Sequence, residues 1–256
     1  MNVALLVGCA PLVDGEYIVP GELPTEVLEG QGALAIRGDD VVVVPEALRA
    51  WFDGSVLVEG RRDGLYRDGL RVEAIDAHAW AGEGPHWIAA TSTGVVTAFL
   101  NWPIDADAVA TDGTRYLAVS CEERVCTVLD LETAEALAET TPGGDVALMD
   151  GVAWWTNPML SQHKAPGVAH SEHGDRIEGL PGDHLRRMDG GWVVGHFNVD
   201  IAPNRGRAIH LGSHTTLAVE RGNAGRPLDV AATATRVALA VPERQVVLNV
   251  EVPGSD

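Results

Sequence analysis

The chain has 256 residues and 46% of them are hydrophobic, which is enough to bury a substantial core. Acidic residues number 37 against 18 basic ones, so the net charge is −19, and Lys164 is the single lysine. Such an acidic surface repels phosphate backbones, so nucleic acid is not expected as a partner. No apolar run approaches the ~18 residues that a membrane span needs.

The N-terminal sequence MNVALLVGCA predicts a strand over residues 3–8, VALLVG. Its LVGC tetrad is similar to a bacterial lipoprotein cleavage box that ends at Cys9. Only eight residues precede Cys9 and none of them is basic, so we expect no working signal peptide. The expected location is therefore the cytoplasm or a particle assembled there.

A repeat of nearly constant length follows. Short apolar runs meet turns that contain an aspartate, and these aspartates are spaced by 37, 36, 38 and 39 residues at Asp39, Asp76, Asp112, Asp150 and Asp189. A sixth unit turns near Thr233 without an aspartate. A period near 40 residues with several short strands per unit predicts an all-β ring of four-stranded sheets.

Residues 105–142 show the unit most clearly, because strands are predicted at DAVAT, RYLAVS, VCTVLDL and EALAE with Asp112-Gly113 in the first turn. The order of apolar residues, Asp-Gly and Tyr-Leu-Ala-Val resembles WD-repeat and related β-propellers. The Gly-His and Trp-Asp dipeptides of true WD repeats are absent. The resemblance implies an architecture and no specific activity.

We predict a single β-propeller domain over residues 1–256, with six blades of four antiparallel strands. The N-terminal strand 3–8 should complete the last blade beside QVVLNVEV or the strand next to it, and so remove an open sheet edge. A seventh blade is the alternative. The six predicted blades are 30–70, 71–104, 105–142, 143–182, 183–225 and 226–256 plus 1–10. Asp112, Asp150 and Asp189 should occupy equivalent turns between the first and second strands of their blades.

The chain has three cysteines, which form neither a disulfide framework nor a zinc ribbon. Cys121 and Cys126 flank a short turn between two predicted strands, so their Cα atoms should lie within about 7 Å of each other. A disulfide is possible at that distance. Because nothing marks export, we expect two neighbouring thiols.

A binding site for metal or ligand has three sets of candidates. The histidines of the irregular stretch 156–184 are suited to transition metals but match no compact motif, and an exposed polar loop is the alternative: His163, His170, His173 and His184. Three tryptophans near strand ends could form an exposed platform for glycans or proteins: Trp80, Trp87 and Trp102. The other candidates are oxygen ligands for calcium.

Six-bladed lactonases and related hydrolases hold calcium at the channel with a Glu, two Asn and an Asp from different blades. The weak resemblance of this chain to them implies Asn101, Asn157 and Asp200 as ligands. The sequence contains no Gly-x-Ser-x-Gly motif and no phosphate-binding loop.

We therefore predict a non-enzymatic binding or assembly module without a cofactor, which binds a protein or glycan. It could be an accessory or host-binding subunit of a virion or another large assembly, or form a homo-oligomer. The alternative is a Ca²⁺-dependent lactonase-like or ester hydrolase. The sequence does not determine the ligand, the oligomeric state or the oxidation state of the cysteine pair.

Overall fold

The computed structural model describes residues 16–17, 32–38, 40–157, 167–180, 184–189, 192–196, 206–210, 216–219, 229–233, 236–241 and 246–251. The regular elements in these residues are antiparallel β-strands. Among the same residues no helix is long and apolar enough to cross a membrane.

The middle of the chain forms three consecutive four-stranded sheets, each a meander of neighbouring strands. The β4–β7 sheet has strands β4 Ala47–Asp53, β5 Val56–Arg61, β6 Gly64–Arg67 and β7 Leu70–Ala74. The β8–β11 sheet has strands β8 Ala77–Glu83, β9 His86–Thr91, β10 Gly94–Val96 and β11 Asn101–Trp102. The β12–β15 sheet has strands β12 Ala108–Thr111, β13 Tyr116–Glu122, β14 Val125–Asp130 and β15 Glu135–Thr140.

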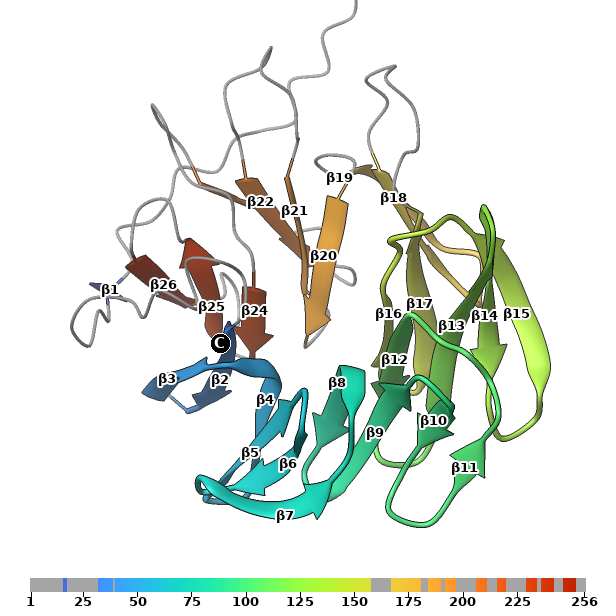
Figure 1. Ribbon diagram of the computed structural model, residues 1–256. Helices are drawn as coiled ribbons and strands as arrows, with labels where there is room; N and C mark the ends of the chain where they lie inside the picture. Colours follow the sequence, from blue (N-terminus) through green and yellow to red (C-terminus); the bar gives the residue numbers. More distant parts are fainter. Residues whose placement is uncertain are drawn as a thin grey trace, which may run out of the picture.

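Two further meanders follow. The β16–β19 sheet has strands β16 Val146–Met149, β17 Val152–Asn157, β18 Gly167–Ser171 and β19 Arg176–Leu180. The β20–β23 sheet has strands β20 His184–Asp189, β21 Trp192–His196, β22 Gly206–His210 and β23 Thr216–Val219. Each sheet places its first strand toward a common centre and its last strand at the periphery (Figure 1).

The last sheet combines both ends of the chain. Its order is β1-β26-β25-β24, with β24 Asp229–Ala232, β25 Arg236–Val241, β26 Val246–Glu251 and β1 Glu16–Tyr17. We predicted a fourth strand from the N-terminal region at residues 3–8, but Glu16–Tyr17 pairs with Leu248–Asn249 at that edge. Residues 3–8 lie outside the described residues. β25 pairs with the other edge of β26, so β1 and β25 together occupy both edges of β26.

The predicted first blade, 30–70, is divided in the structure. β2 Gly32–Arg37 and β3 Asp40–Pro45 form a separate two-stranded hairpin, and a new sheet starts at Ala47. The first strands lie against one another in the order β2, β4, β8, β12, β16, β20 and β24, and β24 also contacts β2. The two-stranded hairpin therefore lies between the last four-stranded sheet and the β4–β7 sheet.

The aspartate turns follow the predicted register in two consecutive sheets and deviate by one position in the third. Asp112 and Asp150 lie in the turn between the first and second strands, whereas Asp189 is the last residue of β20 and pairs with Trp192, directly before the turn. Asp76 was assigned wrongly, because it lies between β7 and β8 and therefore connects two sheets. The corresponding turn of its sheet is Gly84-Pro85, after Glu83. Asp39 lies outside the described residues.

The core consists of apolar layers between neighbouring sheets. Between the β12–β15 and β16–β19 sheets, for example, Leu117, Val119 and Val128 pack with Ala153 and Trp155. Similar layers lie between other neighbouring sheets, including one between the β2–β3 hairpin and strands β24 and β25. The sheets whose side chains the structure describes thus bury their faces against their neighbours, as expected for sheets arranged around an axis.

Cys121 and Cys126 lie opposite each other on β13 and β14, with their Cα atoms 4.0 Å apart. The prediction that they lie close together is confirmed. The structure joins their sulfur atoms in a disulfide, so the expected pair of free thiols is wrong. The two-residue loop Glu123-Arg124 causes this proximity, because it places both cysteines directly across the hairpin.

Candidate functional site: the central cavity and its acidic mouth

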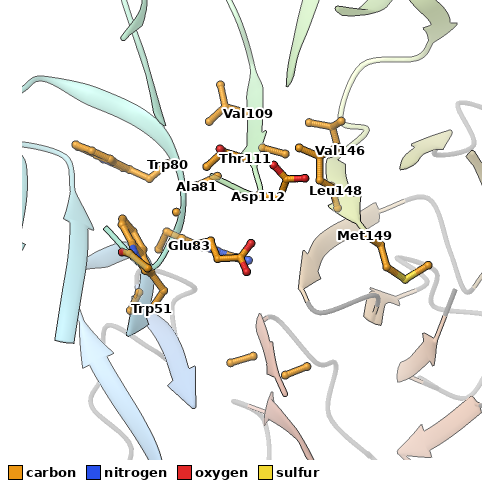
Figure 2. A pocket seen from close by; sticks show the side chains of 18 of the residues that line it. Trp51, Trp80, Ala81, Glu83, Val109, Thr111, Asp112, Val146, Leu148 and Met149 are labelled. Carbon is orange, nitrogen blue, oxygen red and sulfur yellow. The ribbon is translucent and has the colours of Figure 1, made fainter. Parts of the chain in front are cut away.

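A cavity of about 850 Å³ lies at the centre, where the first strands of successive sheets meet. Small and apolar side chains form much of its wall, including Ala50, Ala81, Val109, Val146 and Leu148 (Figure 2). Polar groups lie near both ends of the first strands, with Asp145 directly before β16 and three carboxylates where first strands end. Glu83, Asp112 and Asp150 lie there, one from each of three consecutive sheets. The cavity therefore combines an apolar wall with an acidic mouth.

The carboxylate of Asp112 is fixed by its own turn. Its Oδ1 accepts hydrogen bonds from the backbone N–H groups of Thr114 and Arg115, both at 2.9 Å, and from the Thr114 hydroxyl at 2.8 Å. Burial opposes ionisation of this carboxyl, but the hydrogen bonds outweigh it and lower the pKa of Asp112. Asp112 thus keeps a negative charge at a fixed position on the mouth.

Glu83 and Asp150 are more exposed than Asp112. Figure 2 shows the Glu83 side chain extending from β8 into the cavity. Asp150 adopts a left-handed backbone conformation, with φ of 53°, in the tight turn between β16 and β17. Arg49 of β4 and His210 of β22 also line the cavity. Partial burial lowers the pKa of His210 although Asp150 acts in the opposite direction, so His210 adds little positive charge at neutral pH.

Two tryptophans build the wall between the β4–β7 and β8–β11 sheets. Trp51 donates from Nε1 to the Gly84 carbonyl at 3.1 Å, and Trp80 donates to the Arg61 carbonyl at 2.9 Å. A Cβ at Gly82 would collide with the Trp51 ring, and one at Gly60 would collide with Trp80. The indoles therefore pack directly on glycine backbone, which brings the two sheets close together beside the cavity.

The predicted tryptophan platform is only partly present. Trp80 is 3% exposed and Trp87 is 8% exposed, and their rings contact each other with centroids 5.6 Å apart. The expectation that they are exposed is wrong, because the neighbouring sheet covers both rings. Trp102 is half-buried beside Tyr116, with ring centroids 5.8 Å apart. Among these three tryptophans only Trp80 lines the cavity.

The predicted histidine set is not gathered at the cavity in the described residues. His170 stacks on Trp155 with centroids 6.1 Å apart, and burial together with the charge of Arg176 lowers its pKa. His173 is exposed in the turn after β18. His163 and the side chain of His184 lie outside what the structure describes. Within the described residues no three His, Cys, Asp or Glu side chains are grouped so that they could hold a metal.

The two predicted calcium ligands that the structure describes, Asn101 and Asn157, do not line the cavity. Asn101 lies on β11, which is the outermost strand of its sheet. Asn157 ends β17, and its Oδ1 accepts a hydrogen bond from the Thr141 hydroxyl at 2.7 Å. This bond ties the strand to the segment that leads into the same sheet. Asp200 lies outside the described residues.

Sequence reasoning did not identify Glu83, Arg49 or Met149 as cavity residues. The sequence does contain a signal for such residues, because the residue directly before the turn between the first and second strands faces the cavity mouth in successive sheets. Glu83 precedes Gly84, Thr111 precedes Asp112 and Met149 precedes Asp150, and all three line the cavity. Because Asp76 was wrongly assigned to the first turn of the β8–β11 sheet, the equivalent position of Glu83 in that sheet was not recognised.

The geometry matches known β-propellers. A chain of the mitotic checkpoint complex is similar with a TM-score of 0.59 at 10% identity, over 98% of this chain and 99% of that one. The β-propeller domain of Cps50 (Swd1) from Myceliophteria thermophila is similar with a TM-score of 0.50 at 11% identity, over 88% of this chain and 94% of that one. No family model and no curated protein sequence matches the chain. The fold is that of a β-propeller, and at this identity the likeness shows the fold alone.

Proposed function

We propose that this protein is a non-enzymatic module that binds a protein partner at the acidic mouth of its central cavity. The observation that carries the proposal is that Glu83, Asp112 and Asp150, which come from three consecutive sheets, lie around one opening. Carboxylates presented together by a rigid scaffold favour a partner with a basic surface.

We further infer that the scaffold is a closed ring of seven blades, in which the β2–β3 hairpin is a reduced seventh blade. The circuit of contacts between first strands, which returns from β24 to β2, supports this inference. The pairing of β1 with β26 adds to it, because it joins the two ends of the chain. A closed ring leaves only short, protected strand edges and holds the mouth residues in fixed positions.

The fold also favours binding to proteins over catalysis. One chain of the same fold is part of the mitotic checkpoint complex, and a ring of repeated sheets commonly serves as a binding surface. This support is an analogy between folds and does not identify the partner. Assembly into a virion or another particle, and self-association, are narrower forms of the same proposal.

A charge-reversal experiment tests the proposed mouth. The variant Glu83→Lys/Asp150→Lys reverses two exposed carboxylates and leaves the Asp112 turn intact. The matched control is Glu135→Lys/Glu139→Lys, which changes the charge equally on the peripheral strand β15. Affinity purification from the native host with quantitative mass spectrometry should recover partners with the wild type and the control. The mouth variant should lose them, and equal recovery by all three proteins would contradict the proposal.

Two direct measurements address the alternatives. A glycan array would detect carbohydrate binding, and calorimetric titration with CaCl₂ would detect a calcium site. The hydrolase hypothesis requires calcium to bind and requires Asn157→Ala to weaken that binding. Because Asn157 bonds to Thr141, the variant Thr141→Val is the control for a purely structural effect.

A further inference from the structure

A second candidate binding surface lies between the β4–β7 and β8–β11 sheets. A groove of about 470 Å³ separates the end of β7 from strands β9 and β10. Glu73, Ile75 and Asp76 line one side. Trp87 and the segment 96–98 line the other. The groove lies between β7, the outermost strand of its sheet at the periphery in Figure 1, and the second and third strands of the neighbouring sheet, and it shares no lining residue with the central cavity.

Exposed apolar side chains lie on the two segments that contribute residues to the groove, β7 and the connection from β10 to β11. On β7, Leu70 is 74% exposed and Val72 is 49% exposed. On the connection from β10 to β11, directly after the groove residue Ala98, Phe99 is 95% exposed and Leu100 is 50% exposed. Four of the five large apolar side chains found exposed in the described residues therefore belong to these two segments. A concentration of this kind is typical of an interaction surface.

The turn that carries Phe99 is well ordered by hydrogen bonds. The Thr97 hydroxyl accepts bonds from the backbone N–H groups of Phe99 at 3.2 Å and Leu100 at 3.0 Å. The Thr97 N–H in turn donates to the Leu100 carbonyl at 2.9 Å. The turn thus presents an aromatic ring to solvent from a fixed backbone, which lowers the entropy that binding would cost.

The charge of the groove indicates which chemical groups a partner should carry. Glu73 and Asp76 are exposed, and neither makes an ion pair within the part of the chain that the structure describes. The groove lining itself contains no lysine or arginine, although Arg62 and Arg71 line a smaller depression that shares Ala74, Ile75 and Asp76 with it. The nearby Arg71 has its own partner, Asp63, at 3.6 Å. A ligand with a positive group would complement the two carboxylates, and apolar groups would cover the rim.

We propose that this groove binds a segment of a partner protein in which an aliphatic or aromatic anchor lies beside an arginine or lysine. The anchor packs between Phe99 and the apolar residues of β7, and the basic group pairs with Glu73 and Asp76. This surface extends the proposed protein-binding role beyond the cavity mouth. Its test uses other variants, so either proposal can fail while the other holds.

The test starts from random dodecapeptides displayed on phage and selected on the wild-type protein. Enriched sequences are synthesised with a fluorescent label, and their affinity is measured by fluorescence anisotropy. We expect an apolar anchor within a few residues of Arg or Lys. Affinity should fall at least about tenfold in Leu70→Ser/Phe99→Ser and in Glu73→Lys, as expected for central contact residues. Glu73→Gln, which removes the charge with little change in shape, should also weaken binding.

Matched controls separate this surface from general effects. Val125→Ser removes an apolar side chain that is 52% exposed on the hairpin of another sheet, and Glu135→Lys reverses an exposed charge on β15. Both should bind the selected peptides like the wild type, and all variants should melt at nearly the same temperature because the changed side chains are exposed. Enrichment of acidic peptides, or of peptides that bind wild type and groove variants equally, would overturn the proposal.

Two further measurements decide between occupants. Sedimentation velocity would show a dimer that Leu70→Ser/Phe99→Ser dissociates if a second copy of this chain covers the groove. Co-sedimentation with phosphatidylcholine vesicles, lost in the same variant, would show a lipid surface. Either result would overturn the assignment to a peptide segment.

Discussion

Two interfaces between neighbouring sheets are held together by different contacts, one by indole rings packed on glycine and the other by ion pairs. Between the β4–β7 and β8–β11 sheets, the indoles of Trp51 and Trp80 lie on the backbone of Gly82 and Gly60. Between the β12–β15 and β16–β19 sheets, Arg115 bridges two carboxylates. Its Nε donates to Asp130 at 2.6 Å, and its terminal nitrogens donate to Glu172 at 2.7 and 2.9 Å.

The second interface is a connected polar network at the edge of an apolar layer. Arg115 also donates to the Gly151 carbonyl at 3.1 Å, and Glu172 accepts from the Ala153 N–H at 2.9 Å. The side chains of Arg115, Asp130 and Glu172 are 22%, 6% and 19% exposed, so the network is largely shielded from water. The first interface should therefore respond to changes of volume, and the second to changes of charge.

The largest effect is expected from Trp80→Ala. It removes a buried indole that packs on Gly60 and leaves the Arg61 carbonyl without its donor. Loss of a buried aromatic side chain typically costs about 3–5 kcal/mol of unfolding free energy. Urea denaturation followed by circular dichroism measures this loss. Trp80→Phe is the control for ring packing without the N–H, and an alanine variant as stable as the wild type would refute the close packing.

Gly82→Ala should lower the unfolding free energy by about 2–3 kcal/mol, because the added methyl group overpacks the contact with Trp51. A double-mutant cycle with Trp51→Leu isolates this contact. In the Trp51→Leu background the same alanine should cost much less, since the smaller side chain leaves room for it. Equal costs in both backgrounds would show that the glycine is needed for another reason.

The sequence predicts the repeated sheets better than it predicts these interfaces. Asp112 and Asp150 occupy the predicted turns, and Asp189 lies one position before its turn, because turn chemistry is local and depends on neighbouring residues. The burial of Trp80 and Trp87 depends on the adjacent sheet, so local pattern placed them wrongly on the surface. The β2–β3 hairpin was merged with the following strands into one blade, although it forms a separate sheet that pairs with none of them.

The cavity and the polar network around Arg115 were not predicted from the sequence, because they too depend on contacts between sheets. Arg115 and Glu172 are 57 residues apart, and no spacing rule connects them. The disulfide differs, because Cys121 and Cys126 are joined by one short turn and their proximity follows from hairpin geometry alone. Contacts within a sheet can thus be derived from the sequence, whereas contacts between sheets need the fold.

Arg115→Met should lower the unfolding free energy at pH 7 by about 1–2 kcal/mol. The variant keeps much of the side-chain volume but leaves Asp130 and Glu172 without their shared cation. The magnitude lies between that of an exposed ion pair and that of a fully buried one, since all three side chains are partly shielded. The matched control is Arg124→Met, on the exposed Glu123-Arg124 turn of the same sheet, which should be neutral. Equal losses in the two variants would show that the network contributes nothing specific.

The smallest expected effect is the loss, at acidic pH, of the unfolding free energy that the Arg115 network contributes. Hydrogen bonds from Arg115 lower the pKa of Glu172 against the opposing effect of burial. For Asp130 burial is the larger influence and would raise the pKa, but bonds from Arg115 and from the backbone of Thr133 and Glu132 reverse it. Carboxyl groups whose pKa is lowered by folding stabilise the protein above their unfolded pKa, near 4, and lose that contribution as the pH falls through the folded value.

The difference in unfolding free energy between the wild type and Arg115→Met should therefore be constant from about pH 7 to pH 5 and shrink below about pH 4. The difference between the wild type and Gly82→Ala should stay nearly constant over the same range, because the atoms nearest to the added methyl group belong to the Trp51 indole, which does not titrate. Urea denaturation at several pH values measures both differences. If both shrink in parallel on acidification, the two interfaces are not distinguished by charge, and the contrast between a packed and an ionic interface fails.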